Sequence, residues 1–233
     1  MKSQAAVNLA VSHSHSLTSI GAGLVGLVAN WRLLGAAALL AAAGAAQADG
    51  PPPVFKADLV RGEQVSVTCQ ACHLADGNRG APANPILAGQ HPEYTAKQLA
   101  EFKAGKRQNA IMQGFASLLS EDDMKHVAAF YASKQAKPGF AKNKDTVRLG
   151  EAIFRGGIKA KQVPSCAGCH SPNGAGIPAQ YPRLAGQHAE YTESQLVAFR
   201  SGARANNAQM MTISARLSDV EIKAVSDYLA GLR

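Results

Sequence analysis

The sequence predicts an all-α protein built from two similar domains. Its 233 residues repeat themselves, because PILAGQHPEY at residues 85–94 returns as PRLAGQHAEY at residues 182–191. Apolar side chains recur at helical spacing in both copies, whereas no segment combines strict alternation with the β-branched enrichment typical of strands. Only two copies, each of nearly 90 residues, are present, which indicates a tandem duplication and not a solenoid.

The first 48 residues have the composition of an export signal. They contain no acidic residue and two basic ones, Lys2 and Arg32, before an apolar run at residues 33–46 that ends in Ala-Gln-Ala. This order is typical of a secretory signal peptide that is removed. A retained anchor is the alternative, but Arg32 separates two apolar runs, each shorter than the ~20 residues of a membrane span. We therefore expect residues 1–48 to be a signal peptide and the mature protein to be exported.

Composition excludes some classes of protein. With 46% hydrophobic and 17% charged residues, the chain is neither a multi-span membrane protein nor a disordered one. The formal net charge of +8 by itself suggests a nucleic acid or a membrane surface as partner. Removal of the signal peptide takes away two basic and no acidic side chains, which leaves a net charge of +6 on 185 residues.

The duplication predicts the domain boundaries. We expect a first domain at residues 49–136, a linker at 137–144 and a second domain at 145–233. The linker contains Pro-Gly and three lysines and lacks periodic apolar residues, so we expect it to be solvated. When the chain is divided after Phe140, most of the excess positive charge, +5, falls in the second part.

Three pairs of helical segments are expected. Apolar residues at 59–65 and 147–154 predict a helix that leads into each cysteine pair, and segments 96–104 and 193–201 each follow a threonine suited to an N-cap. The last helix of each domain begins after a serine with an acidic residue three positions later, Ser120 with Asp123 and Ser218 with Glu221, the pattern of a capping box.

The cysteines occur as C-x-x-C-H in both copies: Cys69, Cys72 and His73, then Cys166, Cys169 and His170. A thioredoxin-type redox motif needs a βαβ context, which is missing. A zinc site of four thiolates fits the spacing, but it leaves both histidines without a role and spans two repeats that each look complete. Covalent attachment of haem through two thioethers, with the adjacent histidine on the iron, explains every residue of the motif. The sequence therefore predicts two haem c groups.

The repeat also selects the second axial ligands. Met112 lies eight residues before Ser120 and Met210 eight before Ser218, so these methionines occupy equivalent positions, which we expect on a loop before the last helix. Met124 corresponds to Ile222 and is a core position, while Met211 is the fallback in the second domain. We expect His/Met ligation, His73 with Met112 and His170 with Met210, with bis-histidine ligation as the alternative.

Further residues are expected around each haem. Pro85 and Pro182 each stand 12 residues after the haem histidine, where a carbonyl could accept the imidazole Nδ1–H and fix the ring. We expect His91 and His188 to be surface or propionate-side groups. Arg107 and Arg204 are candidates for propionate pairing or for a solvated surface.

Each half resembles a class I c-type cytochrome, and the pair resembles the dihaem cytochrome c4 family over about residues 55–233. The shared features are C-A-G-C-H followed by P-N-G, then L-A-G-Q-H-A-E-Y-T, and F-R-G-G upstream of the second motif. The resemblance implies two low-spin His/Met haems, a two-fold-like packing of domains and electron transfer between respiratory partners in the periplasm, often with association to the inner membrane or its terminal oxidase.

We expect an electron carrier and not an enzyme, because two closed six-coordinate irons leave no position for a substrate. The expected donor is a quinol-oxidising complex and the expected acceptor a terminal oxidase or reductase, with no nucleic acid. The alternatives are a haem subunit of a membrane-bound oxidase or dehydrogenase, and a dihaem peroxidase-like enzyme, which needs an iron that loses its distal ligand.

Overall fold

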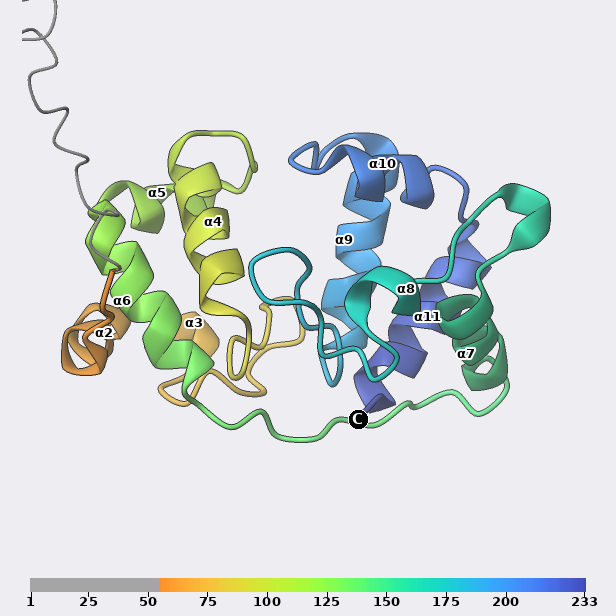
Figure 1. Ribbon diagram of the computed structural model, residues 1–233, viewed down its shortest axis with the longest axis horizontal. Coiled ribbons are helices and arrows are strands. Elements are labelled where there is room, and N and C mark those ends of the chain that lie inside the picture. Colours follow the sequence, from red (N-terminus) through yellow and green to blue (C-terminus); the bar gives the residue numbers. More distant parts are fainter. Residues whose placement is uncertain (1–54) are drawn as a thin grey trace, which may run out of the picture. The chain divides into compact units, whose positions relative to one another are not determined.

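The computed structural model describes residues 55–233, which form one compact unit. The expected signal peptide of residues 1–48 lies outside them. The described residues contain helices and two isolated β-bridges but no β-strand, which confirms the predicted all-α class (Figure 1). None of the helices in this part of the chain is long and apolar enough to cross a membrane.

The helices fall into two equivalent sets. The first set is α2 (Leu59–Ser66), α3 (Gln70–His73), α4 (Pro92–Lys103), α5 (Ala110–Ser117) and α6 (Glu121–Ala132). The second set is α7 (Val147–Gly156), α8 (Ala167–His170), α9 (Ala189–Ser201), α10 (Ala208–Ser214) and α11 (Asp219–Gly231), with a short 3₁₀ helix at Lys159–Lys161. Figure 1 shows the same succession in both halves.

In each half the first helix crosses the last. A β-carbon added at Gly62 of α2 would overlap the carbonyl of His126 on α6, and one added at Gly150 of α7 would overlap the carbonyl of Ala224 on α11. Glycine therefore permits the backbones to touch. The apolar core forms against this crossing, with Tyr131 and Phe154 almost fully buried.

The caps of the last helices confirm the predicted serines. Ser218 and Glu221 form a complete capping box, in which each side chain accepts a hydrogen bond from the backbone N–H of the other. In the first domain Ser120 accepts from the N–H of Asp123, but the carboxylate of Asp123 pairs with Arg61 of α2. The shorter aspartate thus joins two helices and does not complete the box.

The threonine caps expected for the middle helices are wrong. Helix α4 begins at Pro92 and α9 at Ala189, three residues before each threonine. Thr95 and Thr192 are buried within the first turn, where their hydroxyls donate to the carbonyls of His91 and His188. A hydroxyl four residues after a carbonyl bonds back to it inside a helix, so the residue type alone did not identify a cap.

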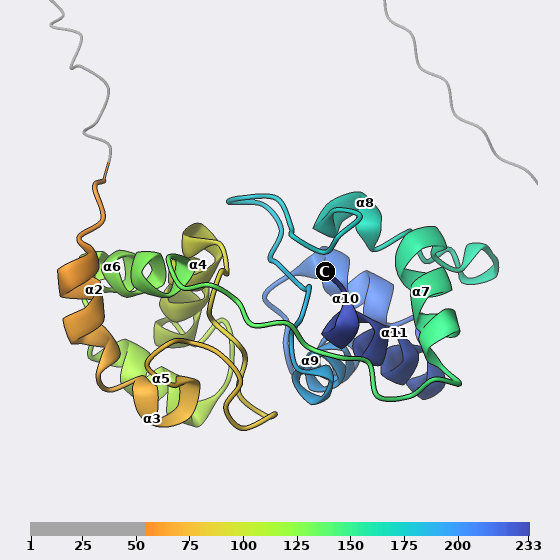
Figure 2. The same ribbon diagram turned by 90° about the horizontal axis from the view of Figure 1, so that it is seen from below.

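The segment between the two sets is also more ordered than expected. The backbone N–H of Lys137 donates to Asn78, and those of Lys142 and Asn143 donate to the carboxylate of Asp227 on α11. Figure 2 shows this segment running from α6 past α11 to α7. Most of its residues are exposed, as expected of a solvated linker, but side chains of both domains hold its backbone.

Candidate haem sites and the interface between them

Each C-x-x-C-H motif forms one short helix that buries its histidine. His73 and His170 end α3 and α8, and only 8% and 7% of their surfaces are exposed. The Nδ1 atom of His73 lies 3.0 Å from the carbonyl oxygen of Pro85, and that of His170 lies 3.0 Å from Pro182 O. A carbonyl only accepts, so Nδ1 carries the proton and Nε2 keeps a free lone pair.

This arrangement suits a neutral metal ligand. Burial lowers the pKa of both histidines, and the bond to the proline carbonyl partly opposes this effect. A neutral imidazole whose second nitrogen is fixed by a carbonyl is the form that binds a metal ion. The residues therefore fit the iron of a haem group on the Nε2 side of each ring.

The cysteines form no disulfide with one another and lie on the same turns as the histidines. Burial raises the pKa of Cys69, and it raises the pKa of Cys166 to about 11. Among residues 55–233 no cluster of three or more histidine, cysteine or acidic side chains forms a metal site, so the four cysteines do not come together.

The residue after each histidine has a strained backbone. Leu74 has φ 61° and ψ 160°, and Ser171 has φ 68° and ψ 150°. This region is essentially restricted to glycine and costs about 1–3 kcal/mol for other residues. The same strain at equivalent positions turns the chain sharply out of each short helix and leads it toward the proline that holds the histidine.

The methionines lie on helices and not on loops, which corrects the prediction. Met112 is the third residue of α5 and Met210 the third of α10. Each backbone N–H donates to an N-cap asparagine three residues earlier, Asn109 at 2.9 Å and Asn207 at 2.8 Å. The repeat of Asn-Ala-x-Met contained this information, because asparagine is a preferred N-cap.

The two adjacent methionines of the second domain differ in their packing. Met210 is half-buried and packs against the core formed by Phe154, Leu196 and their neighbours. Met211, one residue further around the helix, is not part of that core packing. In the first domain Met124 is buried in α6, as expected for a core residue.

The solvated surface expected as one alternative for the two arginines is wrong, because both are buried between the domains; their pairing with haem propionates stays a prediction. Arg107 and Arg204 are only 8% and 7% exposed. Arg107 donates to Gln98 of its own domain at 2.7 Å and to Tyr191 and Gln195 of the other at 2.8 and 2.9 Å. Its guanidinium also stacks on the ring of Phe102.

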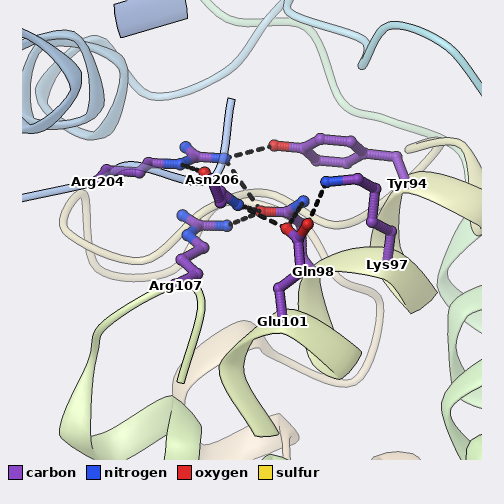
Figure 3. A network of polar contacts seen from close by, with 7 residues as sticks. All are labelled: Tyr94, Lys97, Gln98, Glu101, Arg107, Arg204 and Asn206. Atoms are coloured by element: carbon purple, nitrogen blue, oxygen red, sulfur yellow. Dashed lines mark hydrogen bonds and ion pairs between the residues drawn. The ribbon is translucent and has the colours of Figure 1, made fainter. Parts of the chain in front are cut away.

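Arg204 makes the mirror set of contacts, and its bonds to Tyr94 and Gln98 are drawn in Figure 3. It donates to Gln195 of its own domain and to Tyr94 and Gln98 of the other, and it stacks on Phe199. Each tyrosine, glutamine, arginine and phenylalanine of this network is 97 residues from its counterpart, so the interface has approximate two-fold symmetry. The sequence alone did not reveal this interface role, because a buried arginine cannot be told from a surface one until its partners are known.

The two interface histidines break that symmetry. His91 is half-buried and its Nε2 lies 2.9 Å from the carbonyl of Ala175 in the other domain. His188 is buried, and its Nε2 has no partner among the described residues. Burial is the main reason that the pKa of His188 is lowered, and the charge of Arg79 adds to it. The surface alternative is therefore wrong for His188, whereas the propionate-side alternative stays a prediction for both histidines.

The comparisons with known proteins agree with this geometry. The family model for cytochrome c matches residues 59–134 and again residues 147–233. Cytochrome c4 of Pseudomonas aeruginosa is 45% identical over 179 residues, which cover 75% of this chain and 89% of that protein. The chain belongs to the dihaem cytochrome c4 family.

Two further relatives extend the comparison. The crystal structure of reduced recombinant cytochrome c4 from Pseudomonas stutzeri superposes with a TM-score of 0.72 at 39% identity, covering 76% of this chain and all of that one. A thiosulfate dehydrogenase electron acceptor of Stutzerimonas stutzeri is 37% identical over 209 residues, which cover 87% of this chain and 95% of that protein.

As a member of the cytochrome c4 family, the chain is an electron-transfer protein with two covalently bound haem c groups. Haem supplies one-electron chemistry at its iron. The chain contributes a buried, neutral histidine in each domain and a short methionine-bearing helix. It also surrounds each site with an apolar core, which limits the rearrangement of charge and solvent when an electron arrives.

Proposed function

We propose that this protein is a periplasmic electron carrier in which both irons have histidine and methionine as axial ligands. The axial pairs are His73 with Met112 and His170 with Met210, and the thioethers are formed by Cys69 and Cys72 and by Cys166 and Cys169. Pro85 and Pro182 hold the histidines. The observation that supports this most strongly is the repetition, in both domains, of a proline-bound Nδ1 atom and an asparagine-capped methionine.

Closed coordination favours an electron carrier over an enzyme. With a histidine and a methionine bound, an iron has no open position for a substrate. This argues against the peroxidase-like alternative.

We assign the domain boundaries as expected, with a signal peptide at residues 1–48, domains at 49–136 and 145–233, and a linker at 137–144. The separation of the two family matches, at 59–134 and 147–233, supports this division.

The partners are redox proteins of the respiratory chain. We propose a quinol-oxidising complex as donor and a terminal oxidase or reductase as acceptor, with peripheral association at the inner membrane. A second donor is supported by the relative named as a thiosulfate dehydrogenase electron acceptor, which matches nearly its whole length. In that case the protein would accept electrons from a dehydrogenase. This role resembles the alternative one, in which the protein is a haem subunit of such a complex.

Spectra of the oxidised protein test the ligand assignment. We expect two low-spin irons per chain and the near-infrared-edge absorption band of methionine bound to ferric iron. Replacing Met210 by alanine removes half of that band, whereas Met211→Ala leaves it unchanged. A high-spin ferric signal in the resting protein contradicts the carrier, and loss of the band in Met211→Ala instead of Met210→Ala contradicts the assignment in the second domain.

A further inference from the structure

Two glutamines make reciprocal hydrogen bonds across the domain interface. Both belong to the repeated Ala-Gly-Gln-His sequence and both are 8% exposed. Gln187 of the second domain accepts from the N–H of Ile86 at 2.9 Å and donates to the carbonyl of the same residue at 3.0 Å. Gln90 of the first domain makes the same two bonds with Arg183, at 2.9 and 3.0 Å.

The orientation of each glutamine amide follows from its partners. The Oε1 atom of Gln187 also accepts from the N–H of His188 at 2.9 Å, and that of Gln90 accepts from the N–H of His91 at 3.0 Å. Each oxygen thus faces two donors while the Nε2 atom faces a carbonyl. A flipped amide would place donors against donors, so only this orientation satisfies the buried groups.

The peptide groups that receive these bonds are the ones that hold the axial histidines. The N–H of Ile86 and the carbonyl of Pro85 belong to one peptide unit, and that carbonyl accepts from the Nδ1–H of His73. The peptide unit between Pro182 and Arg183 joins His170 to Gln90 in the same way. A single peptide unit therefore connects the histidine of each domain to a glutamine of the other.

We propose that Gln187 and Gln90 are positioning residues that tune, each in the opposite domain, how strongly His73 and His170 donate electrons to iron. A peptide whose N–H is hydrogen-bonded has a more negative carbonyl oxygen, since hydrogen bonds in a chain strengthen one another by about 10–30% per bond. A more negative Pro85 oxygen pulls harder on the Nδ1–H of His73 and makes the ring a more basic ligand.

The sign of the effect follows from charge. A more basic histidine stabilises ferric iron more than ferrous iron, so the bond from the glutamine lowers the reduction potential of the opposite haem. The packing of the two domains and their two potentials are thereby linked, because separation of the domains breaks both bonds. The inference rests on the proposed axial role of the two histidines.

The test replaces Gln187 by leucine, which has a similar volume and no polar atoms. Both potentials are measured by spectroelectrochemical titration, and the Nδ1–H protons of both histidines are followed by NMR of the reduced holoprotein. We expect the potential of the first haem to rise and the His73 proton to move upfield, while His170 is unchanged. Gln90→Leu is expected to give the mirror result at the second haem. Equal shifts at both haems, or a shift only in the domain that carries the substitution, overturn the inference.

A matched control separates tuning from loosening of the interface. Tyr191→Phe removes another cross-domain bond, the one from Arg107, without touching the glutamine. We expect it to leave the His73 proton and potential in place. A shift as large as that in Gln187→Leu would mean that any weakening of the interface has this effect, and it overturns the inference.

The unaltered protein gives an independent measurement. A through-bond scalar coupling between the amide nitrogen of Ile86 and the side-chain carbonyl carbon of Gln187 is expected in the reduced state, and its absence from well-resolved spectra overturns the inference. The ring protons of His73 distinguish this failure from failure of the proposed function. If they lack the large upfield shift of an iron-bound imidazole, the ligand assignment itself is wrong, and the inference is lost with it.

Discussion

At the scale of single residues, each haem motif concentrates strain and polar bonding in a few positions. Leu74 and Ser171 both have a backbone conformation that favours glycine, at the point where the chain leaves the histidine-bearing helix. Ser171 gains a partial compensation, because its hydroxyl donates to the carbonyl of Gly176 at 2.8 Å. The side chain of Leu74 is 40% exposed and makes no such bond, so a substitution there changes few contacts besides the backbone strain.

Substitutions at Leu74 should reverse the usual order of alanine and glycine. In ordinary backbone conformations glycine is less stable than alanine by about 0.5–1 kcal/mol. With φ at 61°, alanine keeps the β-carbon that causes the strain and glycine removes it. We expect Leu74→Gly to be more stable than Leu74→Ala by about 1 kcal/mol, measured by guanidinium unfolding of the ferric protein. Alanine more stable than glycine would show that this backbone conformation is not strained.

At the scale of helices, two features decide where the functional side chains lie. One is the asparagine that caps α5 or α10 and bonds the N–H of the methionine. The other is the glycine that lets α2 or α7 touch the last helix of its domain. The first positions a ligand directly, whereas the second fixes the scaffold from which the haem motif extends.

Removal of one asparagine cap should weaken one methionine bond. Asn207→Ala is expected to destabilise the first turn of α10 by about 1 kcal/mol. The absorption band of Met210 on ferric iron should then disappear at lower denaturant concentration, while the contribution of Met112 serves as an internal reference. Asn207→Asp keeps an acceptor for the N–H of Met210 and should behave like the unaltered protein. Equal behaviour of the alanine and aspartate variants would contradict the role of the cap.

The glycine at the helix crossing can be compared with a second glycine on the same helix. A β-carbon at Gly150 would overlap the backbone of α11, whereas one at Gly156 would meet no atom within 4 Å. We expect Gly150→Ala to lower the free energy of unfolding by about 2 kcal/mol. Gly156→Ala should be neutral or stabilising by up to about 1 kcal/mol. Thermal unfolding of both variants checks the difference, and similar values would show that α7 can shift freely on α11.

Local patterns explain why much of the fold was predictable. The C-x-x-C-H motif, the serine caps and the apolar spacing act within a few residues, so the helices around Cys69 and after Ser218 were expected correctly. Thr95 was expected as an N-cap and Met112 on a loop, but both lie in the first turn of a helix. In the sequence, the residues just before a helix and those of its first turn are hard to tell apart. Arg107 and His188 depend on partners about 85 residues or more away in the chain or on burial itself, which periodicity does not reveal.

At the scale of the whole molecule, the two domains share polar groups that neither satisfies alone. Arg107 and Arg204 are buried charges whose hydrogen bonds are divided between both halves. A hydrogen bond to a charged group contributes about 1.5–3 kcal/mol, and loss of one partner leaves the others buried without a bond. Separation of the domains therefore breaks all the hydrogen bonds that the two arginines make across the interface at once.

This coupling predicts how the protein unfolds. We expect the unaltered holoprotein to give one calorimetric transition, because unfolding of either domain removes partners from the other. Arg107→Ala leaves Tyr191 and Gln195 of the second domain without that donor, and should give two resolved transitions, one for each domain. Lys125→Ala, which removes an exposed ion pair with Asp122, is the control and should keep a single transition.

A double-mutant cycle of Arg107→Ala with Tyr191→Phe should give a coupling energy of about 0.5–3 kcal/mol. A coupling energy of zero, with one transition in every variant, would mean that the two domains are held together by other contacts and that the buried arginines do not link them.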